Sequence, residues 1–348
     1  MKRLLFVVFL LLIHPQVKAQ QVFTIGGVVK DATGKPLALA TVFIDGSKRV
    51  TATNDQGEYK FAGLEPGTYQ LVVNMIGFYS VKQTVNVKNQ PVVLNLSLKE
   101  KDEQLKEVMI SFDPHRAAYL ALFIKNFLGT TENAAGCEIL NTEILKFKEN
   151  KKANTLDATS DDFLIIINQK LGYKIKYLLR KFSYNRMSTV ASYDGELIFE
   201  NIDGSDQEQS EWVANRKKAY KGSLMQYMRA LFVNKTVDKN FATYELRGTQ
   251  PVLVDVNTFI KQIDSNFISF AFKNPLYIRY DTLAHQLYQQ QDFRFTQKMG
   301  NDGTLLRLYL KRATIDKKGS YVDFRSFLVK GYWGGKRIGD HLPFEYQE

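Results

Sequence analysis

The sequence has few of the residues that metal sites, disulfide frameworks and membrane spans require. Only one of its 348 residues is cysteine, Cys137, which excludes an internal disulfide framework and a cysteine-based zinc cluster. Its histidines leave little material for a metal or acid–base centre: His14, His115, His285 and His341. Beyond the N-terminus, no stretch approaches the ~18 consecutive apolar residues of a transmembrane helix. We therefore predict no metal, no cofactor and no disulfide-linked partner.

The motifs of common hydrolytic and phosphate-binding enzymes are also missing. A zinc carboxypeptidase needs a histidine and a glutamate three residues apart plus a distant histidine. Three places after His115, His285 and His341 stand Ala118, Tyr288 and Phe344. Neither a P-loop nor a Gly-x-Ser-x-Gly elbow occurs. The sequence therefore indicates no catalytic residue.

The first twenty residues have the order of a secretory signal peptide. A positive start is followed by an apolar run at 4–13, and small or apolar residues precede Gln20. The run is about half the ~20 residues that span a bilayer, so cleavage after Ala19 is favoured over an uncleaved anchor. We predict a signal peptide at 1–19 and export to the periplasm or outer-membrane surface of a Gram-negative bacterium.

Charge and composition describe a folded, basic chain. The apolar fraction is 45% and the charged fraction 24%, both ordinary for a soluble protein. The formal net charge is +11, but its Lys and Arg residues are scattered. A solvated basic surface is the favoured interpretation, and weak attraction to anionic lipid or glycan surfaces is the alternative. Nucleic acid is not expected as a partner of an exported protein.

Residues 21–98 carry the pattern of a small β-sandwich. Apolar residues alternate along short segments separated by turn residues, which places one side of each strand in a core. The pattern predicts seven strands: 24–30, 40–44, 50–53, 58–61, 69–75, 81–87 and 92–98. Asn54–Gly57 is read as a hairpin loop, with Gly57 available for a positive φ. Seven short strands suit two packed antiparallel sheets.

These segments also resemble a known family. The segments 27–37, 40–44, 53–59, 64–69 and 77–79 resemble the carboxypeptidase regulatory-like domain in order and spacing. The resemblance covers roughly residues 22–98 and implies a transthyretin-like β-sandwich. It does not imply peptidase activity, because in carboxypeptidases this domain stands beside the catalytic one. In secreted bacterial proteins such modules serve in folding, docking or surface presentation.

A charged linker at 99–107 is followed by a region, 108–348, that mixes helices and strands. Helices are predicted over 114–128, 207–221 and 224–232, the last two separated by Gly222-Ser223 with Ser223 as an N-cap. Asp194-Gly195 is read as a two-residue hairpin. Further strands are expected at 163–167, 173–179, 267–272, 276–281, 293–297, 305–310 and 321–329. The predicted fold class is mostly β: a seven-stranded sandwich, then an α+β domain with mostly antiparallel strands.

Pieces of the second region resemble an uncharacterised C-terminal region that follows the same sandwich in bacterial envelope proteins. The pieces are 127–131, 137–141, 171–177, 215–223 and 342–346. This resemblance implies location and architecture only, because no activity comes with it.

One group of residues is a candidate contact for a ligand or partner. Trp212, Arg216 and Tyr220 recur every four residues and share one helix face, and Ser223 and Arg229 follow on the next helix. Two arginines near aromatic rings and a helix N-terminus could hold an anionic group. The favoured interpretation is structural, with the aromatic rings packed inward and the arginines paired with local acids.

The sequence therefore favours a non-enzymatic exported envelope protein. Its sandwich serves as an accessory or docking module for an envelope protein or a surface glycan, and peripheral membrane contact is compatible with its charge. Two alternatives remain. One is a hydrolase or other enzyme, with Asp161, Asp162, Asp194 and Asp281 as candidate carboxylates. The other is a glycan-binding protein that uses exposed aromatic residues such as Tyr332 and Trp333.

Overall fold

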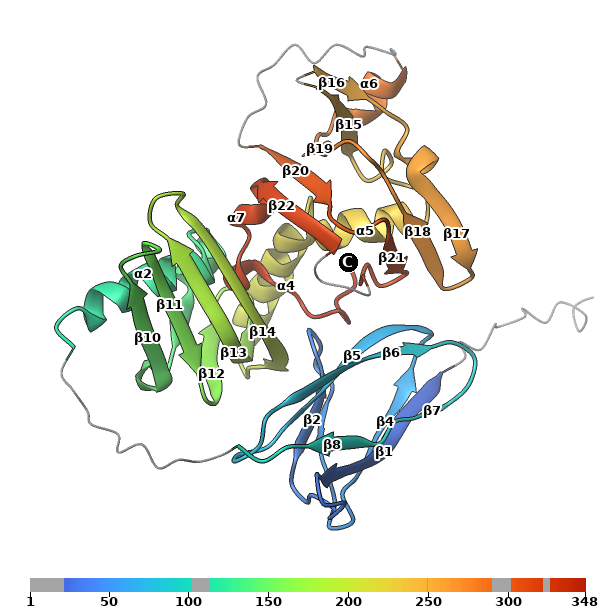
Figure 1. Cartoon of the computed structure of the whole chain (residues 1–348). Helices are drawn as coiled ribbons and strands as arrows, with labels where there is room; N and C mark the ends of the chain where they lie inside the picture. Colours follow the sequence, from blue (N-terminus) through green and yellow to red (C-terminus); the bar gives the residue numbers. More distant parts are fainter. Residues whose placement is uncertain (1–21, 102–112, 249, 290–301, 322–325) are drawn as a thin grey trace, which may run out of the picture.

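The computed structural model describes residues 22–101, 113–248, 250–289, 302–321 and 326–348. They form an N-terminal sandwich, a six-stranded sheet with a helix against it, and two smaller sheets toward the C-terminus (Figure 1). The chain is mostly β with chiefly antiparallel pairing, which confirms the predicted fold class. Of the helices described, none is both long and apolar enough to cross a membrane. The predicted signal peptide lies outside the described residues.

The sandwich is built from two sheets that share one core. Its strands are β1 (Phe23–Asp31), β2 (Thr41–Ile44), β3 (Val50–Ala52), β4 (Glu58–Leu64), β5 (Gly67–Asn74), β6 (Val81–Val87), β7 (Val92–Val93) and β8 (Leu96–Leu98). One sheet has the order β4-β1-β7, with β8 also paired to β1, and the other has the order β3-β2-β5-β6. In β4, Tyr59 and Phe61 are buried while Glu58 and Lys60 are exposed. This alternation gives each sheet one apolar face, and the two faces pack together.

Two predictions for the sandwich need correction. The strand expected at 92–98 is two short strands, β7 and β8, and both run parallel to β1. Between them the Asn95 side chain accepts the Val28 N–H at 2.9 Å in place of a backbone partner. Asn54–Gly57 is not a hairpin, because β3 pairs with β2 whereas β4 pairs with β1. Gly57 has the expected positive φ, +74°, in a turn that crosses between the sheets.

The second part is a six-stranded sheet of order β10-β11-β13-β12-β9, with β14 paired to β13. Its strands are β9 (Cys137–Ile139), β10 (Leu145–Asn150), β11 (Thr155–Ser160), β12 (Phe163–Asn168), β13 (Tyr173–Asn185) and β14 (Val190–Asn201). The helix predicted over 114–128 is α2 (Arg116–Leu128), whose Phe123 and Phe127 join the core of this sheet. The short α3 (Glu132–Ala135) and the 3-10 turn η1 (Thr142–Ile144) flank β9.

The hairpin predicted at Asp194-Gly195 is wrong. Both residues lie inside β14, which pairs with β13 along its length, and the chain reverses after Asn185. Gly195 has a different reason to be glycine. A Cβ there would lie 2.5 Å from the Tyr177 ring and 2.4 Å from the Leu178 carbonyl oxygen.

Two helices lead into the last part. They are α4 (Asp206–Tyr220) and α5 (Leu224–Phe232), and Ser223 caps α5 as predicted by accepting the Gln226 N–H. A five-stranded sheet, β16-β15-β19-β20-β22, and a three-stranded sheet, β17-β18-β21, share a core with α5. The strands are β15 (Phe241–Arg247), β16 (Gln250–Leu253), β17 (Ile260–Asp264), β18 (Phe267–Phe270), β19 (Leu276–Tyr280), β20 (Gly303–Leu308), β21 (Ala313–Asp316) and β22 (Phe327–Gly331). Short helical elements complete it: η2 (Val256–Phe259), α6 (Ala284–Gln289), α7 (Tyr332–Gly335) and η4 (Ile338–Asp340). The strand predicted at 293–297 lies outside the described residues.

Candidate functional site

The sandwich packs on the six-stranded sheet through a row of outward side chains. Phe43, Val72 and Lys82 are register partners across β2, β5 and β6. Phe43 and Val72 are fully buried, but against Ile198 of β14 rather than in the sandwich core. The centre of one outer face of the sandwich thus contacts β14, and Phe163 of β12 also packs on Phe43 there. Figure 1 shows an end of the six-stranded sheet close to the sandwich. We call this contact region the junction.

Four charged side chains lie beside the apolar contact of the junction. Lys82 Nζ is 2.9 Å from Asp45 Oδ2 and 3.6 Å from Glu196 Oε1. Arg180 Nε donates to both carboxylate oxygens of Glu196, at 2.8 and 2.9 Å. The Leu197 N–H donates to Asp45 Oδ1 at 2.9 Å. Two acids and two bases thus link the sandwich to β13 and β14 in a charge-balanced network.

Burial controls the protonation of these groups. It raises the pKa of the Asp45 carboxyl above its usual value, against the opposing pull of Lys82. It also raises the pKa of the Glu196 carboxyl, and here Arg180 opposes it most. Burial alone would lower the pKa of Lys82, but Asp45 and Glu196 outweigh that effect and the pKa is raised. Each cation therefore stabilises an acid whose ionised form is otherwise costly in this dry setting.

The C-terminal segment (residues 336–348) connects the three parts. The Asn168 side chain donates to the Gly339 carbonyl at 2.9 Å, and the Phe344 N–H donates to the Gly46 carbonyl at 3.0 Å. The Lys48 N–H donates to the Glu345 carboxylate at 3.2 Å. A Cβ on Gly46, whose φ is +75°, would lie 2.5 Å from the Phe344 ring. The segment thus fits between the sandwich and the six-stranded sheet.

A cavity of about 950 Å³ lies beside this segment, where the sandwich, β14, α5 and the C-terminal segment meet. Its volume is at the upper end of the ~300–1,000 Å³ typical of ligand pockets, which often form between domains. Aromatic side chains line it: Tyr69, Tyr177, Tyr193, Phe199, Tyr321, Trp333 and Phe344. We call it the junction cavity.

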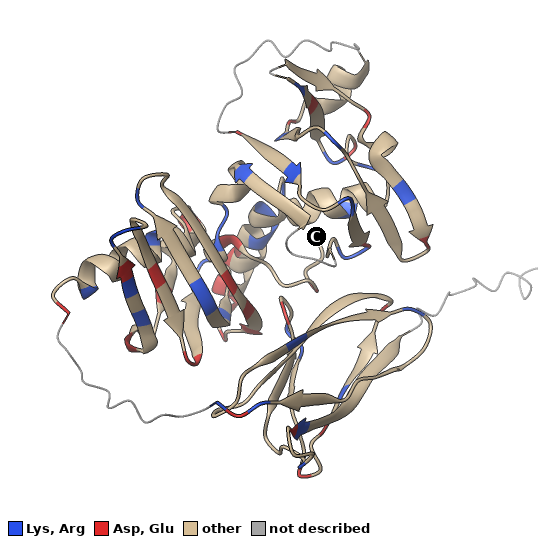
Figure 2. Cartoon of the chain, in the orientation of Figure 1, with Lys and Arg blue, Asp and Glu red and all other residues tan. Residues whose placement is uncertain are grey.

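The cations that line the junction cavity are all engaged within the protein. Four of them pair with acids: Lys82 with Asp45, Lys317 with Glu65, Lys318 with Asp316, and Lys336 with Asp340. Arg49 donates to the carbonyls of Ala62 and Gly63. Arg229 donates to the carbonyls of Lys318, Phe344 and Tyr346. Figure 2 shows the same mixing of both charge signs across the molecule.

The turn after β21 places buried polar groups at and behind the cavity wall. Asp316 is fully buried, accepts the N–H groups of Lys318 and Ser320, and accepts the Thr68 N–H of the sandwich at 3.0 Å. Lys318 Nζ lies 3.1 Å from Asp316 Oδ2 and 3.7 Å from the centre of the Tyr69 ring. Burial lowers the pKa of Lys318, and Asp316 opposes that shift. Ser320 Oγ is buried, and within the described ranges it has no hydrogen-bond partner.

Trp212 and Arg216 of the predicted contact group pack on the turn between β12 and β13 and on the start of β13. Trp212 is buried, and its Nε1 donates to the Gln169 carbonyl at 2.8 Å. Arg216 Nε donates to the Leu171 carbonyl at 2.6 Å, and its guanidinium stacks 4.1 Å from the centre of the Tyr173 ring. The partners of Arg216 are therefore carbonyls and a ring, not the local acids that the sequence suggested.

Tyr220, Ser223 and Arg229 lie together at the other end of the helix pair. Tyr220 is buried, and its ring centre lies 5.2 Å from that of Tyr346. The Arg229 guanidinium lies 5.4 Å from the Tyr220 ring centre and binds the C-terminal segment. Ser223 and Arg229 line the junction cavity, whereas Trp212 and Arg216 do not.

The residues named for the two alternative functions, glycan binding and hydrolysis, do not come together as those functions require. Trp333 is buried, with Nε1 donating to the Gly222 carbonyl, so it does not form an exposed platform with the half-exposed Tyr332. The four candidate carboxylates do not gather into one site: Asp161 pairs with Lys146 and Asp281 with Arg279, Asp162 precedes β12 and accepts the Phe163 N–H, and Asp194 lines the junction cavity. Within the described ranges, no group of three or more His, Cys, Asp or Glu side chains could hold a metal ion.

The thiol of Cys137 is a packing group. Its Sγ lies 3.4 Å from the Asn133 carbonyl oxygen, and the side chain packs against the core of the six-stranded sheet. Burial and the nearby Asp340 raise its pKa to about 12, so the thiol is protonated at neutral pH.

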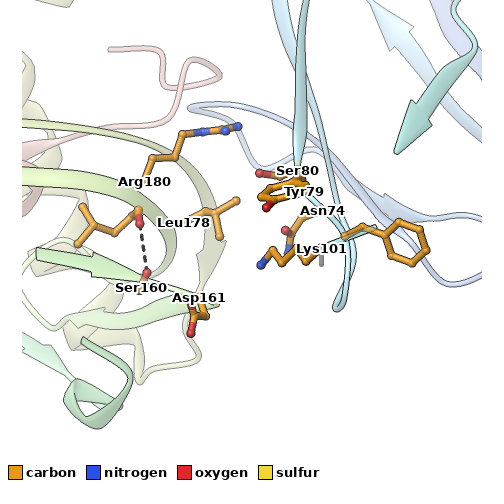
Figure 3. Close-up of a pocket in the computed structure, with 10 residues that line it drawn as sticks. Asn74, Tyr79, Ser80, Lys101, Ser160, Asp161, Leu178 and Arg180 are labelled. Atoms are coloured by element: carbon orange, nitrogen blue, oxygen red, sulfur yellow. Dashed lines mark hydrogen bonds between the residues drawn. The ribbon is translucent and has the colours of Figure 1, made fainter. Parts of the chain in front are cut away.

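A smaller pocket of about 110 Å³ lies at the other side of the junction. Figure 3 shows Tyr79, Ser80 and Lys101 of the sandwich facing Asp161 and Arg180 across it. The wall on the sandwich side is fixed by the Tyr79 N–H, which donates to the Lys99 carbonyl, and by the Lys101 N–H, which donates to the Gly77 carbonyl. The start of the predicted linker therefore pairs with the sandwich.

The sequence reasoning missed the charged groups of the junction. From the sequence, Asp45 closes the strand predicted at 40–44, and Glu196 follows the predicted Asp194-Gly195 hairpin in the 189–200 segment. A signal was present for Glu196, because it lies between Gly195 and the apolar 197–199 segment of a long strand. The Asp316–Ser320 segment reads as a turn, and nothing local indicates that its side chains meet the sandwich.

Two packed sheets with one shared core define the N-terminal part as a β-sandwich. Residues 25–110 match the family model of the CarboxypepD_reg-like domain, so this part is a carboxypeptidase regulatory-like domain, as the sequence indicated. The match ends at Ile110, and the resemblance of residues 108–348 to a region of envelope proteins stays a prediction. Among curated proteins, none matches the chain.

Several solved structures are similar to part of the chain. One is the pilus 2b backbone protein of group B streptococcus, with 17% identity and a TM-score of 0.21, over 23% of this chain and 42% of that one. Another is the 3-chlorocatechol 1,2-dioxygenase of Rhodococcus opacus 1CP, with 10% identity and a TM-score of 0.21, over 25% and 64%. A third is the catechol 1,2-dioxygenase of Acinetobacter radioresistens, with 11% identity and a TM-score of 0.21, over 26% and 56%. The chain spans less than two thirds of each of these proteins, and similarity at this level says nothing about activity.

Proposed function

We propose that the protein is an exported, non-enzymatic envelope protein whose sandwich is an accessory module that docks another envelope protein. The observation that carries this proposal is the asymmetry of the sandwich. One outer face is buried in the junction, while the outer face of the β4-β1-β7 sheet stays open to a partner. We also retain the predicted boundaries, 21–98 for the sandwich and 108–348 for the second domain, as part of the proposal.

The open face has the surface expected of a docking face. Gly26, Lys60 and Val93 are register partners across β1, β4 and β7. Lys60 and Val93 are exposed, and Val93 keeps 78% of its surface accessible. Because Gly26 carries no side chain, a partner backbone can approach the centre of the sheet closely. Val93 on the edge strand β7 offers an apolar side chain, and Lys60 on the opposite edge strand β4 offers a charged one.

Export and docking are tested in the same cells. Mass spectrometry of the envelope fraction should find Gln20, or its cyclised form, as the N-terminus. A photo-crosslinking residue at Val93 should then give one defined adduct with an envelope protein. The same residue placed at Tyr309, which is 67% exposed in the last part of the chain, serves as the control. Recovery of residues 1–19 on the mature protein contradicts export, and the same adducts at both positions contradict docking by the sandwich.

A further inference from the structure

We propose that the junction cavity binds a neutral oligosaccharide, which bridges the sandwich and the last part of the chain. This site is distinct from the open sandwich face and does not depend on the docking proposed above. It is also not the exposed aromatic surface that the sequence suggested at Tyr332 and Trp333. Trp333 is buried in the cavity wall, and Tyr332 does not line the cavity.

The charge balance of the wall argues for a neutral ligand. Each lysine or arginine that lines the cavity already contacts a carboxylate or backbone carbonyls. An anionic ligand would have to separate one of these pairs, and a cationic ligand would have to compete for the same acids. His341 brings no positive charge, because burial lowers its pKa despite the neighbouring Asp340. A neutral molecule meets no such penalty.

The polar groups of the wall argue for a ligand rich in hydroxyl groups. Ser320 is 8% exposed, and its buried Oγ has no hydrogen-bond partner among the residues that the structure describes. Buried donors without partners are rare in folded proteins, because each loses its bonds to water. Hydroxyl groups can donate to and accept from such atoms at the same time.

The aromatic rings and the volume argue for a sugar chain. Tyr193 of β14 and Tyr321 of the last part line the cavity from two different parts of the chain, and sugar rings have apolar faces that pack on aromatic rings. A volume of about 950 Å³ accommodates more than a single sugar unit. Since Tyr69 belongs to the sandwich and Ser320 to the last part, a bound oligosaccharide contacts both.

The test uses the mature chain and a panel of defined sugars. Maltotetraose, cellotetraose and chitotetraose are the neutral probes, and polygalacturonate and heparin are the charged ones. Isothermal titration should show binding of at least one neutral probe and of neither charged one. The bound probe should also raise the melting temperature, because it binds only the folded chain.

Ser320→Ala is the decisive variant. Its Oγ makes no hydrogen bond to any described part of the chain, so the variant should melt like the wild type. Loss of one ligand hydrogen bond should weaken sugar binding about three- to tenfold. Tyr332→Ala is the matched control and should bind like the wild type. Binding of no neutral probe, binding of charged probes only, or loss of binding in Tyr332→Ala but not in Ser320→Ala would each overturn the proposal.

Discussion

Arg216 and Arg229 are the residues on which the structural and anion-binding interpretations differ most. Each uses its guanidinium on backbone carbonyls and on an aromatic ring. We expect replacement of either by Met to lower the free energy of unfolding by about 1.5–3 kcal/mol, the value of hydrogen bonds to a charged group. Chemical denaturation measures this loss, and Lys217→Met, an exposed change on the same helix, is the control.

The anion-binding interpretation predicts the reverse. Both variants would then unfold like the wild type, because an exposed charge contributes only about 0–1 kcal/mol. Capture of the envelope partner would fall instead, most strongly at low salt, where charge attraction is least screened.

Lys82 provides a second test at the scale of a residue. Lys82→Met leaves Asp45 with the Leu197 N–H but without its cation, and should destabilise the protein by about 1–3 kcal/mol. Lys60→Met, on the open face, should have little effect. Because burial raises the pKa of Asp45, the folded protein binds this proton more tightly than the unfolded chain does. In Lys82→Met the cation that opposes this shift is gone, so the pKa of Asp45 rises further than in the wild type. Lowering the pH from 8 to 5 therefore favours the folded variant more than the folded wild type, and the destabilisation caused by Lys82→Met should become smaller.

A double variant isolates the pair. Asp45→Asn combined with Lys82→Met removes both charges, so it should cost less than the sum of the two single changes. Strictly additive costs, or a penalty that grows toward pH 5, would show that Lys82 acts only through packing.

At the scale of elements, Gly195 shows where local reasoning succeeds and fails. Alternation predicted the strands on both sides, and the helix breaks at Gly222-Ser223 were readable from sequence. The Asp194-Gly195 pair was read as a turn because a hairpin and a close contact both favour glycine. Only the partner strand distinguishes them, since Tyr177 of β13 occupies the space of a Cβ at this position.

Gly195→Ala should therefore destabilise the six-stranded sheet by about 1–3 kcal/mol through overpacking. Thermal unfolding measures the effect. Gly335→Ala is the matched control, because a Cβ there meets nothing within 4 Å. Equal melting of the two variants would mean that the Tyr177 ring moves aside without cost.

The same limit applies to the site. The hydrogen bonds that tie the sandwich to the rest of the chain include pairs of residues more than 100 positions apart in the sequence. Asp45 meets Leu197, and Thr68 meets Asp316. Local patterns predict which residues of each strand face the sandwich core. Which of the two outer faces of the sandwich becomes buried depends on the second part of the chain, and local patterns do not indicate it. The candidate residues on α4 and α5 could be found from the sequence because they recur at helical spacing within one short segment.

At the scale of the whole molecule, the sandwich should fold without the rest. Its core is made only of its own residues. A fragment of residues 21–101 should show β-type circular dichroism and a cooperative thermal transition. It should also self-associate, because Phe43 and Val72 lose their cover, and Phe43→Thr should reduce the association in sedimentation measurements. A disordered spectrum would show that β14 is needed for folding.

The C-terminal segment determines how firmly the sandwich is held. Removing residues 343–348 deletes the Phe344 bond to Gly46 and the Glu345 bond to Lys48, and leaves Arg229 without two of its carbonyl partners. We expect the cores of the sandwich, of the six-stranded sheet and of the last part to stay folded in the shortened chain. The sandwich should move relative to the rest, so that the radius of gyration from X-ray scattering increases. Removing only Gln347 and Glu348, both exposed, should leave the scattering unchanged. Unchanged scattering after the longer deletion would mean that the row of Phe43, Val72 and Lys82 holds the sandwich by itself.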